Sequence, residues 1–412
     1  MRFSCSSNRP LTVLLPLALV GYASCPAALA QENKSDGLKF EPDAGLVYSD
    51  GDFRLTAWGF AERVVDLDGP DSFRRVRQGA EFDFPRFTRT LRPALVYEID
   101  LTNTDFFDNG FGGADGFGRR NFENLFLAVQ DADNPSRFRV LFGENTHILS
   151  RDDNLPSGNL PTINRSLILE EHGSVNSFGT QWGVQLQSAL SDQVTVQFAA
   201  SDNRGSLNAA DPRWTIGNSL SAKVLFTPIN DSASGQRLTA GLAIDDTADI
   251  TNRTFTLSTA ITGETLGGVL ATGDKLSWEG DLAYAFPLFG RATTLEGEAI
   301  YSDFSVSNSD VGGGYVMAQH SLFDSEDVGD LDLFARYDFV TLGAVAISGR
   351  AEQSAVRAGV NYNLPFTGKL VSLHFEYAHN SVSGPAAIVP FARDDDEVRL
   401  ELRISLQRYV RH

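Results

Sequence analysis

Basic side chains recur along this chain in segments where the residues on either side of them are apolar. Arg139, for example, lies between Phe138 and Val140. A row of such charges along a water-filled wall attracts or repels ions, because the local field decides which ions enter. Ion selectivity is therefore the first chemistry to consider. The candidate pore-lining residues are Arg75, Arg77, Arg139, Arg151, Arg165, Lys223, Arg336, Arg357, Arg399 and Arg403.

Six of these arginines are expected to lie together if the chain closes on itself. They are Arg75, Arg77, Arg336, Arg357, Arg399 and Arg403. As a basic sector they would attract anions even in an acidic protein. Alternatively, they pair with acids on the same faces and only keep the wall wet. Those acids are Glu81, Asp83, Asp338 and Glu401.

Other reactive groups are sparse. The sequence contains no metal-type His-x-x-x-His pair, no nucleophile elbow and no phosphate-cradling glycine loop. We therefore expect no cofactor, no metal site and no enzymatic activity, although a barrel hydrolase with a serine–histidine pair at a strand end stays an alternative. His374 and Glu376 would share one strand face as a solvated pair. The acidic run 394–397 is typical of a solvated loop, and it could also bind calcium or bridge lipopolysaccharide.

Composition narrows the class of protein. The chain has 412 residues, with 34 Lys and Arg against 53 Asp and Glu, so its formal charge is −19. This balance argues against a nucleic-acid partner, which requires a basic surface. The only two cysteines are Cys5 and Cys25, so the rest of the chain can form neither a disulfide nor a thiolate metal site.

The N-terminus has the three parts of a secretory signal peptide. Arg2 and Arg9 precede a short apolar run, 11–20, and Ala28-Leu29-Ala30 provides a cleavage site after Ala30. The run is too short to cross a bilayer. A buried N-terminal helix and a lipoprotein acylated at Cys25 are the alternatives. We expect a signal peptide at 1–30, a periplasmic segment at 31–51 and a barrel at 52–412.

From about residue 52, apolar and polar residues alternate with period two, which is the pattern of strands with one polar face. No stretch is long and apolar enough for a membrane helix. Sixteen strands are predicted at 52–66, 73–84, 93–103, 121–130, 137–145, 179–190, 193–202, 216–227, 237–246, 276–286, 292–303, 313–323, 330–340, 354–364, 370–380 and 397–408.

A soluble β protein and a membrane barrel both contain such strands. Charge recurs on the polar face in strand after strand, which a packed soluble core would not tolerate. The connections also alternate between short turns, such as Ser191-Asp192, and long loops, as in outer-membrane barrels. We therefore predict an all-β, 16-stranded antiparallel transmembrane barrel in the bacterial outer membrane, with both termini at the short-turn end.

Two connections need separate treatment. The longest, 146–178, contains residues of both charges together with apolar clusters such as Leu167-Ile168-Leu169. We expect this third loop to fold inward as the constriction, with a mobile external loop as the alternative. The segment Thr254–Thr262 also alternates and could be a further strand. We assign it to a structured loop, because bacterial barrels have even strand numbers.

Four segments resemble the phosphate-selective porin O and P family. They are 73–82 (FRRVRQGAEF), 95–101 (LVYEIDL), 139–145 (RVLFGEN) before the long loop, and the pair 333–339 (LFARYDF) and 357–362 (RAGVNY). The resemblance implies a 16-stranded, usually trimeric barrel that passes anions. Two features depart from the family. The best-known members of the family line the constriction with clustered lysines, whereas this chain has only five lysines in total. The family also tends to end on an aromatic residue, whereas this sequence ends on Arg408-Tyr409-Val410-Arg411-His412.

Together, the pattern and the resemblance predict an outer-membrane porin that lets small hydrophilic solutes diffuse passively. Anions such as phosphate are the expected cargo, and outer-membrane lipid and lipopolysaccharide are the expected surroundings. A homotrimer is implied by the resemblance alone. A non-selective or cation-preferring porin and an outer-membrane hydrolase remain as alternatives. A soluble periplasmic β protein would be extracted without detergent.

Overall fold

The computed structural model describes residues 37–41, 45–66, 72–101, 122–155, 160–169, 180–202, 218–258, 265–325, 327–344, 349–365, 370–389 and 393–406. The predicted signal peptide, its cleavage site after Ala30, both cysteines and the last residues, 407–412, lie outside these ranges. Within them, no helix combines the length and apolar character needed to cross a bilayer.

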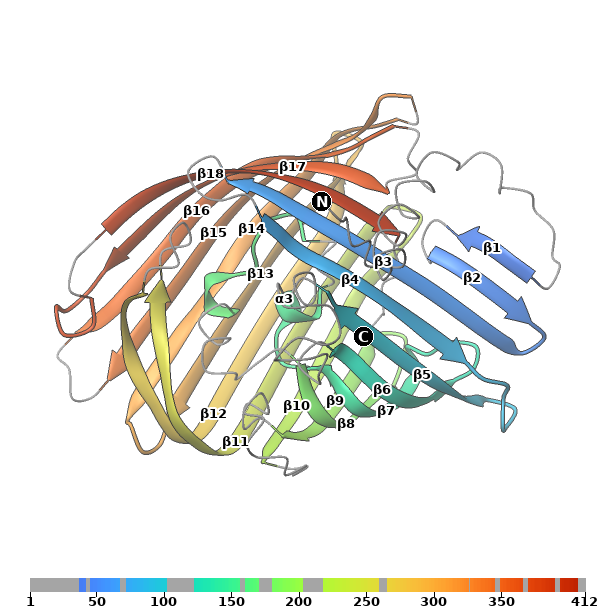
Figure 1. Ribbon diagram of the computed structural model, residues 1–412, viewed down its shortest axis with the longest axis horizontal. Coiled ribbons are helices and arrows are strands. Elements are labelled where there is room, and N and C mark those ends of the chain that lie inside the picture. The colour runs from blue at the N-terminus through green and yellow to red at the C-terminus, as the bar shows by residue number, and fades with distance from the viewer. Residues whose placement is uncertain are drawn as a thin grey trace, which may run out of the picture.

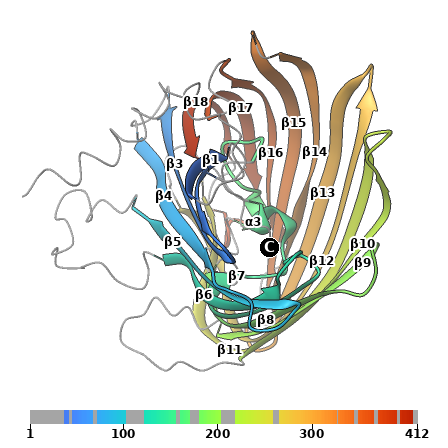
Figure 2. The ribbon, with the colours of Figure 1, turned by 90° about the vertical axis from the view of Figure 1, so that its right-hand side faces the viewer.

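Sixteen antiparallel strands close into a barrel (Figures 1 and 2), as predicted. Closure is made by β18, which pairs with β3 from Arg399 opposite Asp66 to Leu406 opposite Gly59. The strands are β3 (Phe53–Asp66), β4 (Ser72–Asp83), β5 (Leu91–Asp100), β6 (Phe122–Asp131), β7 (Phe138–Thr146), β8 (Thr180–Ala189), β9 (Val194–Asp202), β10 (Ser219–Asp231), β11 (Gln236–Ser258), β12 (Thr265–Leu288), β13 (Arg291–Phe304), β14 (Ser309–Ser325), β15 (Gly329–Ala344), β16 (Arg350–Asn363), β17 (Val371–Ser383) and β18 (Arg393–Leu406).

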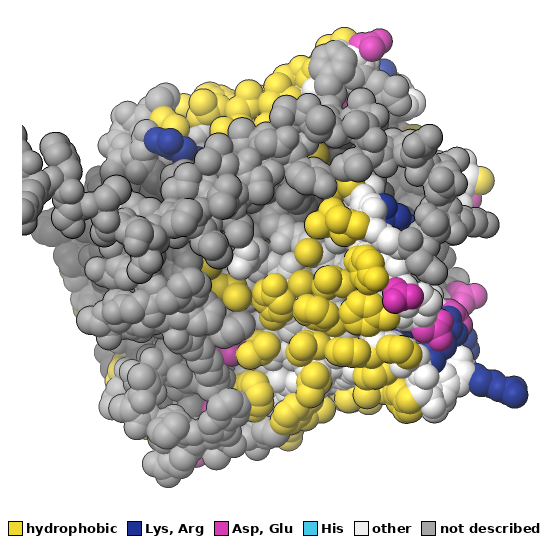
Figure 3. All heavy atoms as spheres, turned by 45° about the vertical axis from the view of Figure 1, so that its right-hand side comes forward, with side chains coloured by type: hydrophobic (Ala, Val, Ile, Leu, Met, Phe, Trp, Pro, Cys, Tyr) yellow, Lys and Arg dark blue, Asp and Glu magenta, His cyan; other side chains and the backbone are white. Residues whose placement is uncertain are grey.

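The period-two pattern sorts side chains between the two faces of the wall. On β11, Leu242 is 72% exposed on the outside, whereas Asp245 on the other face is fully buried. Figure 3 shows the result from one side: hydrophobic side chains form a broad patch on the outer face, and charged side chains gather along one edge. An apolar outer face and a polar inner face are the arrangement of a transmembrane barrel, in which every backbone amide is paired within the sheet.

A charge placed on the outer face should therefore be costly in proportion to its depth. We expect Leu242→Arg to lower the free energy of unfolding by about 2–4 kcal/mol, because Leu242 lies on the outer face in the middle of 237–247, the part of β11 that pairs with both β10 and β12. Asp246 lies on the same face, at the long-loop end of this doubly paired part, so Asp246→Arg should change that free energy by only about 0–1 kcal/mol. Equilibrium unfolding in lipid vesicles measures both, and equal losses would contradict the assignment of faces.

The N-terminal segment contains a hairpin that the sequence pattern did not indicate. Its strands are β1 (Gly37–Glu41) and β2 (Gly45–Asp50). β2 pairs with β3 from Leu46 opposite Ala57 to Asp50 opposite Phe53. It uses the same edge of β3 as β18, whose described pairing ends with Leu406 opposite Gly59. The hairpin therefore pairs the part of the β3 edge that β18 does not reach, as an edge with free amides requires. Strands of five and six residues are too short to give a clear alternation.

Most described residues between the predicted strands 237–246 and 276–286 belong to strands, so the assignment of this segment to a structured loop was wrong. β11 and β12 continue as a paired hairpin beyond the wall, with Thr254 opposite Leu270. Register shifts after Thr247 and Ile250 interrupt the ladder and disturb the alternation by which we set the strand ends. Thr254–Ser258 belongs to β11 and adds no strand to the barrel, so the even count holds; 259–262 lie outside the described residues.

The sequence pattern had led us to expect a polar inner face on every strand, but part of the interior is apolar. At the long-loop end, the inner face of β13, β15 and β16 carries apolar side chains, for example Phe304, Leu342 and Ala351, each 1% exposed or less. They belong to one buried cluster with Leu149 and Leu167–Leu169 of the third loop and with Leu257 of the β11–β12 hairpin. Loop side chains cover these strand positions, which makes apolar residues favourable inside the barrel.

Candidate functional site

The third loop lies within the ring of strands (Figure 2) and makes contacts with the polar inner face of β10 to β18. We use the name inner loop for its described parts, residues 147–155 and 160–169. It contains one helical turn, α3 (Arg151–Asn154). The remaining residues of this connection, including His172, Glu170 and Glu171, lie outside the described ranges.

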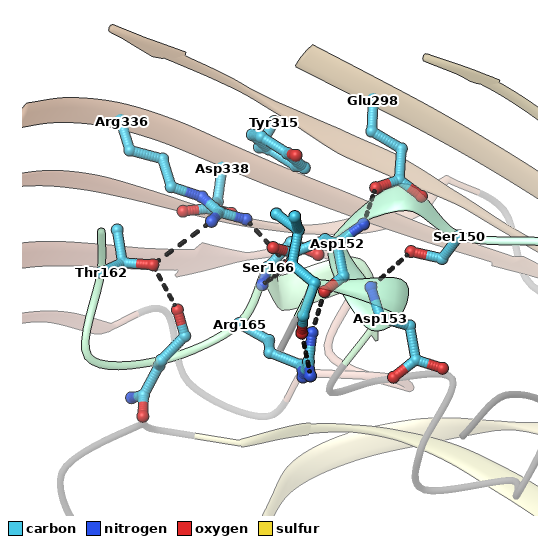
Figure 4. Close-up of polar contacts among 12 residues, drawn as sticks. Ser150, Asp152, Asp153, Thr162, Arg165, Ser166, Glu298, Tyr315, Arg336 and Asp338 are labelled. Atoms are coloured by element: carbon cyan, nitrogen blue, oxygen red, sulfur yellow. Dashed lines mark hydrogen bonds and ion pairs between the residues drawn. The ribbon is translucent and has the colours of Figure 1, made fainter. Parts of the chain in front are cut away.

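Arg336 of β15 is the centre of the first group of contacts (Figure 4). Its Nε donates to Asp338 Oδ1 at 2.9 Å, and its Nη2 lies 3.4 Å from Asp152 Oδ2 of α3. The guanidinium stacks over the ring of Tyr315 at 3.8 Å from the ring centroid, and Nη1 donates to Thr162 Oγ1 at 3.4 Å. One arginine thus joins both parts of the inner loop to the wall.

Neighbouring strands hold the second part of the loop through its backbone. Arg357 of β16 donates to the carbonyls of Asn164 and Arg165 at 3.4 and 3.3 Å, and Arg403 of β18 donates to the carbonyl of Leu160 at 3.2 Å. In the other direction, the Ile163 amide donates to Glu376 Oε2 of β17 at 2.9 Å. Because these bonds go to main-chain groups, they fix the path of the loop whatever its side chains are.

The first turn of α3 is capped from both sides. Ser150 is the N-cap residue, and its hydroxyl accepts from the Asp153 amide at 3.0 Å. Glu298 of β13 accepts from the amides of Arg151 and Asp152 at 3.2 and 2.9 Å. A carboxylate at this end of the turn satisfies amides that the turn itself cannot pair.

The charge of Asp152 is matched to this position. Burial of Asp152 raises the pKa of its carboxyl, but the charges of Arg336 and Arg165 and the hydrogen bond from the Ser166 amide outweigh burial and hold that pKa below its ordinary value. The carboxylate therefore remains ionised at neutral pH, and the ion pair with Arg336 persists there.

Lys223 and His147 hold the start of the inner loop against β10 to β12. Lys223 Nζ donates to the carbonyl of Leu149 at 2.8 Å and pairs with Asp281 at 2.9 Å. His147 Nε2 lies 2.8 Å from Ser221 Oγ and 3.3 Å from Asp245 Oδ1. A catalytic relay needs the serine and the aspartate on opposite ring nitrogens. Here both are on Nε2, so this cluster attaches the loop and has no relay geometry.

The register brings the six arginines of the predicted basic sector onto neighbouring strands. Arg336 is directly opposite Arg357, Arg399 is opposite Glu376, and Arg403 is opposite Glu62, which in turn is opposite Arg75. Their acidic partners differ in part from the expected ones. With acids of the wall, the ion pairs are Arg336–Asp338, Arg357–Asp338, Arg399–Glu397, Arg403–Glu401, Arg403–Glu62, Arg75–Glu62, Arg77–Glu98 and Arg77–Asp100, and Arg336 also pairs with Asp152 of the inner loop.

Of the other four candidates, two lie on strands outside this sector and two belong to the inner loop, where the Arg165 carbonyl accepts from Arg357. Arg139 of β7 stacks over Phe126 at 5.1 Å and is buried, and Lys223 is on β10. Arg151 and Arg165 belong to the inner loop. Arg151 pairs with Glu296 at 3.2 Å, and Arg165 donates to the carbonyls of Asp152 and Leu155. Three members of the site were not among the predicted residues, although alternation places each of them on the inner face: Glu62, Glu298 and Tyr315.

The acidic run 394–397 and the pair of His374 and Glu376, both considered from sequence, have hydrogen-bond partners within the protein. Asp396 accepts from Tyr377 at 2.7 Å and lies 2.8 Å from His379 Nδ1. His374 Nε2 lies 2.8 Å from Ser372 Oγ, whereas Glu376 accepts a hydrogen bond from the Ile163 amide of the inner loop. Across the described ranges, no group of three or more histidine, aspartate or glutamate side chains is arranged to hold a metal ion.

Comparisons with known proteins relate the chain to a structural class. No family model matches the sequence, so the resemblance to the phosphate-selective porins is not confirmed, and no curated protein matches it. Among solved structures, OmpT, an outer membrane protein of Vibrio cholerae, aligns over 87% of this chain and 99% of its own with a TM-score of 0.55 and 11% identity.

Two further structures show the same likeness. The anion-selective porin of Comamonas acidovorans aligns over 86% of this chain and 99% of its own, with a TM-score of 0.52 and 14% identity. The outer membrane channel DcaP of Acinetobacter baumannii aligns over 87% and 98%, with a TM-score of 0.54 and 12% identity. The chain therefore has the fold of outer-membrane β-barrel channels. At this identity, its activity has to be argued from its own residues.

Proposed function

We propose that this protein is a porin of the bacterial outer membrane through which small hydrophilic solutes diffuse passively. The observation that carries this proposal is the inner loop. It is held against one half of the polar inner wall, β10 to β18, by bonds from Arg336, Arg357, Arg403, Lys223 and Glu298. A loop fixed inside a water-filled barrel narrows the lumen without closing it. The width and the charge of the narrowed lumen then select which solutes pass.

The proposed path runs between the inner loop and the wall of β3 to β9. Charged side chains with some solvent access border it from both sides. Arg151 is 25% exposed on the loop, and Asp100 is 22%, Arg75 17% and Arg77 14% exposed on the wall. Groups of both signs at these positions keep water in the path.

The pairing of the arginine sector favours the non-selective alternative over an anion porin. Each of the six arginines has a carboxylate within 4 Å, and Arg336, Arg357 and Arg403 are at most 3% exposed. A neutralised row of charges produces a weak field at the distance of a passing ion. We propose that small neutral and singly charged solutes pass with little discrimination, and that phosphate has no dedicated site here.

The setting of the protein is part of the same proposal. The apolar outer face fits outer-membrane lipid, with lipopolysaccharide around the long-loop end. We propose a homotrimer, as in one solved form of the V. cholerae protein, whose description states a trimer.

A planar-bilayer recording tests the proposal. Protein purified in detergent should insert as channels of fixed conductance, and in a salt gradient the reversal potential should stay close to zero. A reversal potential near the full anion limit would contradict weak selectivity and restore the anion porin. Folded protein that produces no channels would overturn the porin itself.

A further inference from the structure

The inner wall of β7 and β8 contains a hollow that the arginine sector does not reach. Gly143 of β7 is directly opposite Gly183 of β8. A Cβ at Gly143, whose φ is +142°, would overlap the Leu125 carbonyl oxygen, and one at Gly183 would overlap that of Ala200. Since neither position admits a side chain, the wall leaves a small hollow here, with room for a group about the size of one water molecule.

The side chains that line this hollow are uncharged. The polar ones are Asn145, Gln181, Gln185 and Ser201, and Leu141 adds an apolar surface. Ser201 Oγ donates to Gln181 Oε1. Asn145 Nδ2 donates to Gln185 Oε1 at 2.7 Å, and Gln185 Nε2 donates to the Thr146 carbonyl at 2.7 Å. Amides and a hydroxyl group thus surround a space that contains no ionisable group.

These bonds fix the orientation of the Asn145 amide. The Thr146 carbonyl can only accept, so Gln185 must present its Nε2 there and its Oε1 to Asn145. Asn145 must then present its Nδ2 to Gln185, which leaves Oδ1 on its other side. Asn145 is 2% exposed, and its Oδ1 has no donor among the described residues. A buried acceptor without a donor is unfavourable, so this atom has free capacity for an incoming hydrogen bond.

The same wall carries two more acceptors of this kind. Asn124 Oδ1 and Gln130 Oε1 of β6 are also buried and also lack a donor within the described part of the chain. Asn124 lies toward the long-loop end of the wall and Gln130 toward the short-turn end. The β6–β8 wall therefore offers amide oxygens along the proposed path, on the side away from the inner loop.

We propose that the hollow is a weak subsite for a neutral hydroxylated solute, a sugar or polyol, whose hydroxyl group donates to Asn145 Oδ1. The proposal rests on the porin function and names a substrate class for it. A simple anion such as chloride has no hydrogen to donate, a phosphate would lose hydration without a cation to replace it, and a cation would lose hydration without a carboxylate to replace it. A hydroxyl group both donates and accepts, which suits a lining of amides. The hollow is far smaller than ordinary ligand pockets, so it takes a single hydroxyl group of a solute and releases it readily.

Saturation-transfer NMR with D-glucose on the detergent-purified protein tests the subsite without relying on channel activity. We expect a saturable signal, and we expect Asn145→Leu to weaken glucose binding about 3–10-fold, the effect of one hydrogen bond. The matched control is Gln187→Leu. Gln187 lies on the same face of β8, and its amide is bonded to the Ser136 carbonyl and to Gln197 instead. This control should bind glucose like the parent protein.

Bilayer recordings separate the two proposals. Glucose should reduce the ion current of the parent channel, and Asn145→Leu should raise the half-blocking concentration by the same factor. Normal channels with no glucose signal, or with the same signal in Asn145→Leu, would overturn the subsite and leave the porin intact. A glucose signal that depends on Asn145 in protein without channels would support the subsite and overturn the porin.

Discussion

Replacing Arg336 with methionine is expected to release the inner loop from the wall and to raise single-channel conductance. Arg336 joins Asp152 and Thr162 of the loop to Asp338 of β15, and it is 2% exposed. Methionine keeps much of the volume and removes every one of these bonds. The lost charge leaves buried carboxylates with fewer partners, and breaking a buried pair in this way is unfavourable by about 3–5 kcal/mol.

The direction of the accompanying selectivity change follows from the charges that remain. Asp152 and Asp338 stay in the lumen, and Asp338 retains Arg357 at 3.3 Å. The local field becomes more negative, so the reversal potential of Arg336→Met in a salt gradient should move toward the cation limit. Conductance, reversal potential and protease cleavage of the loop are the three measurements.

Arg75→Met is the matched control for this experiment. Arg75 belongs to the same sector, pairs with Glu62 at 3.9 Å and is 17% exposed. The contacts that hold the inner loop come from other strands, so this variant should shift the reversal potential while the loop stays protected from protease. Equal loop cleavage and equal conductance in Arg336→Met and the parent protein would show that Arg336 does not hold the loop.

The barrel could be predicted from sequence because its signal is local and repeated. A strand with one face to lipid and one to water repeats the same contrast at every second residue, as Leu242 and Asp245 show on β11. The same parity placed Arg336 and Arg357 on the inner face. That they are directly opposite each other follows only from the register of β15 and β16. The turn between two strands determines their register, and the sequence spacing predicts it only to within a residue or two.

The hydrogen-bond partner of each charged side chain could not be predicted from the sequence. Arg357 and Arg403 donate to loop carbonyls that any sequence would offer, and Glu298 caps a turn more than a hundred residues away in the chain. No pattern in the strands marks such partners. The apolar cluster was missed for a related reason. Residues such as Phe304 and Leu342 follow the inner-face parity, but only the folded loops show that they are covered.

The second large effect is expected from Leu257→Asp at the end of β11. Leu257 is fully buried in the apolar cluster that also contains Ile168, Leu149 and Phe304. A carboxylate there loses its hydration among apolar side chains, and removing the leucine side chain alone is unfavourable by about 2–5 kcal/mol. We expect the outer part of the β11–β12 hairpin to leave the cluster while the sixteen-stranded wall stays folded.

Limited proteolysis and channel recording measure this outcome. In Leu257→Asp, cleavage should become rapid between residues 248 and 272, and conductance should rise because the cluster no longer fills the long-loop end of the barrel. Leu270→Asp is the control. Leu270 lies close by on the paired strand β12, opposite Thr254, but is 51% exposed, so the same charge should have little effect. If both variants are cleaved alike, the hairpin is not held by the buried face of β11. If neither is cleaved, the position of the hairpin does not depend on the burial of Leu257.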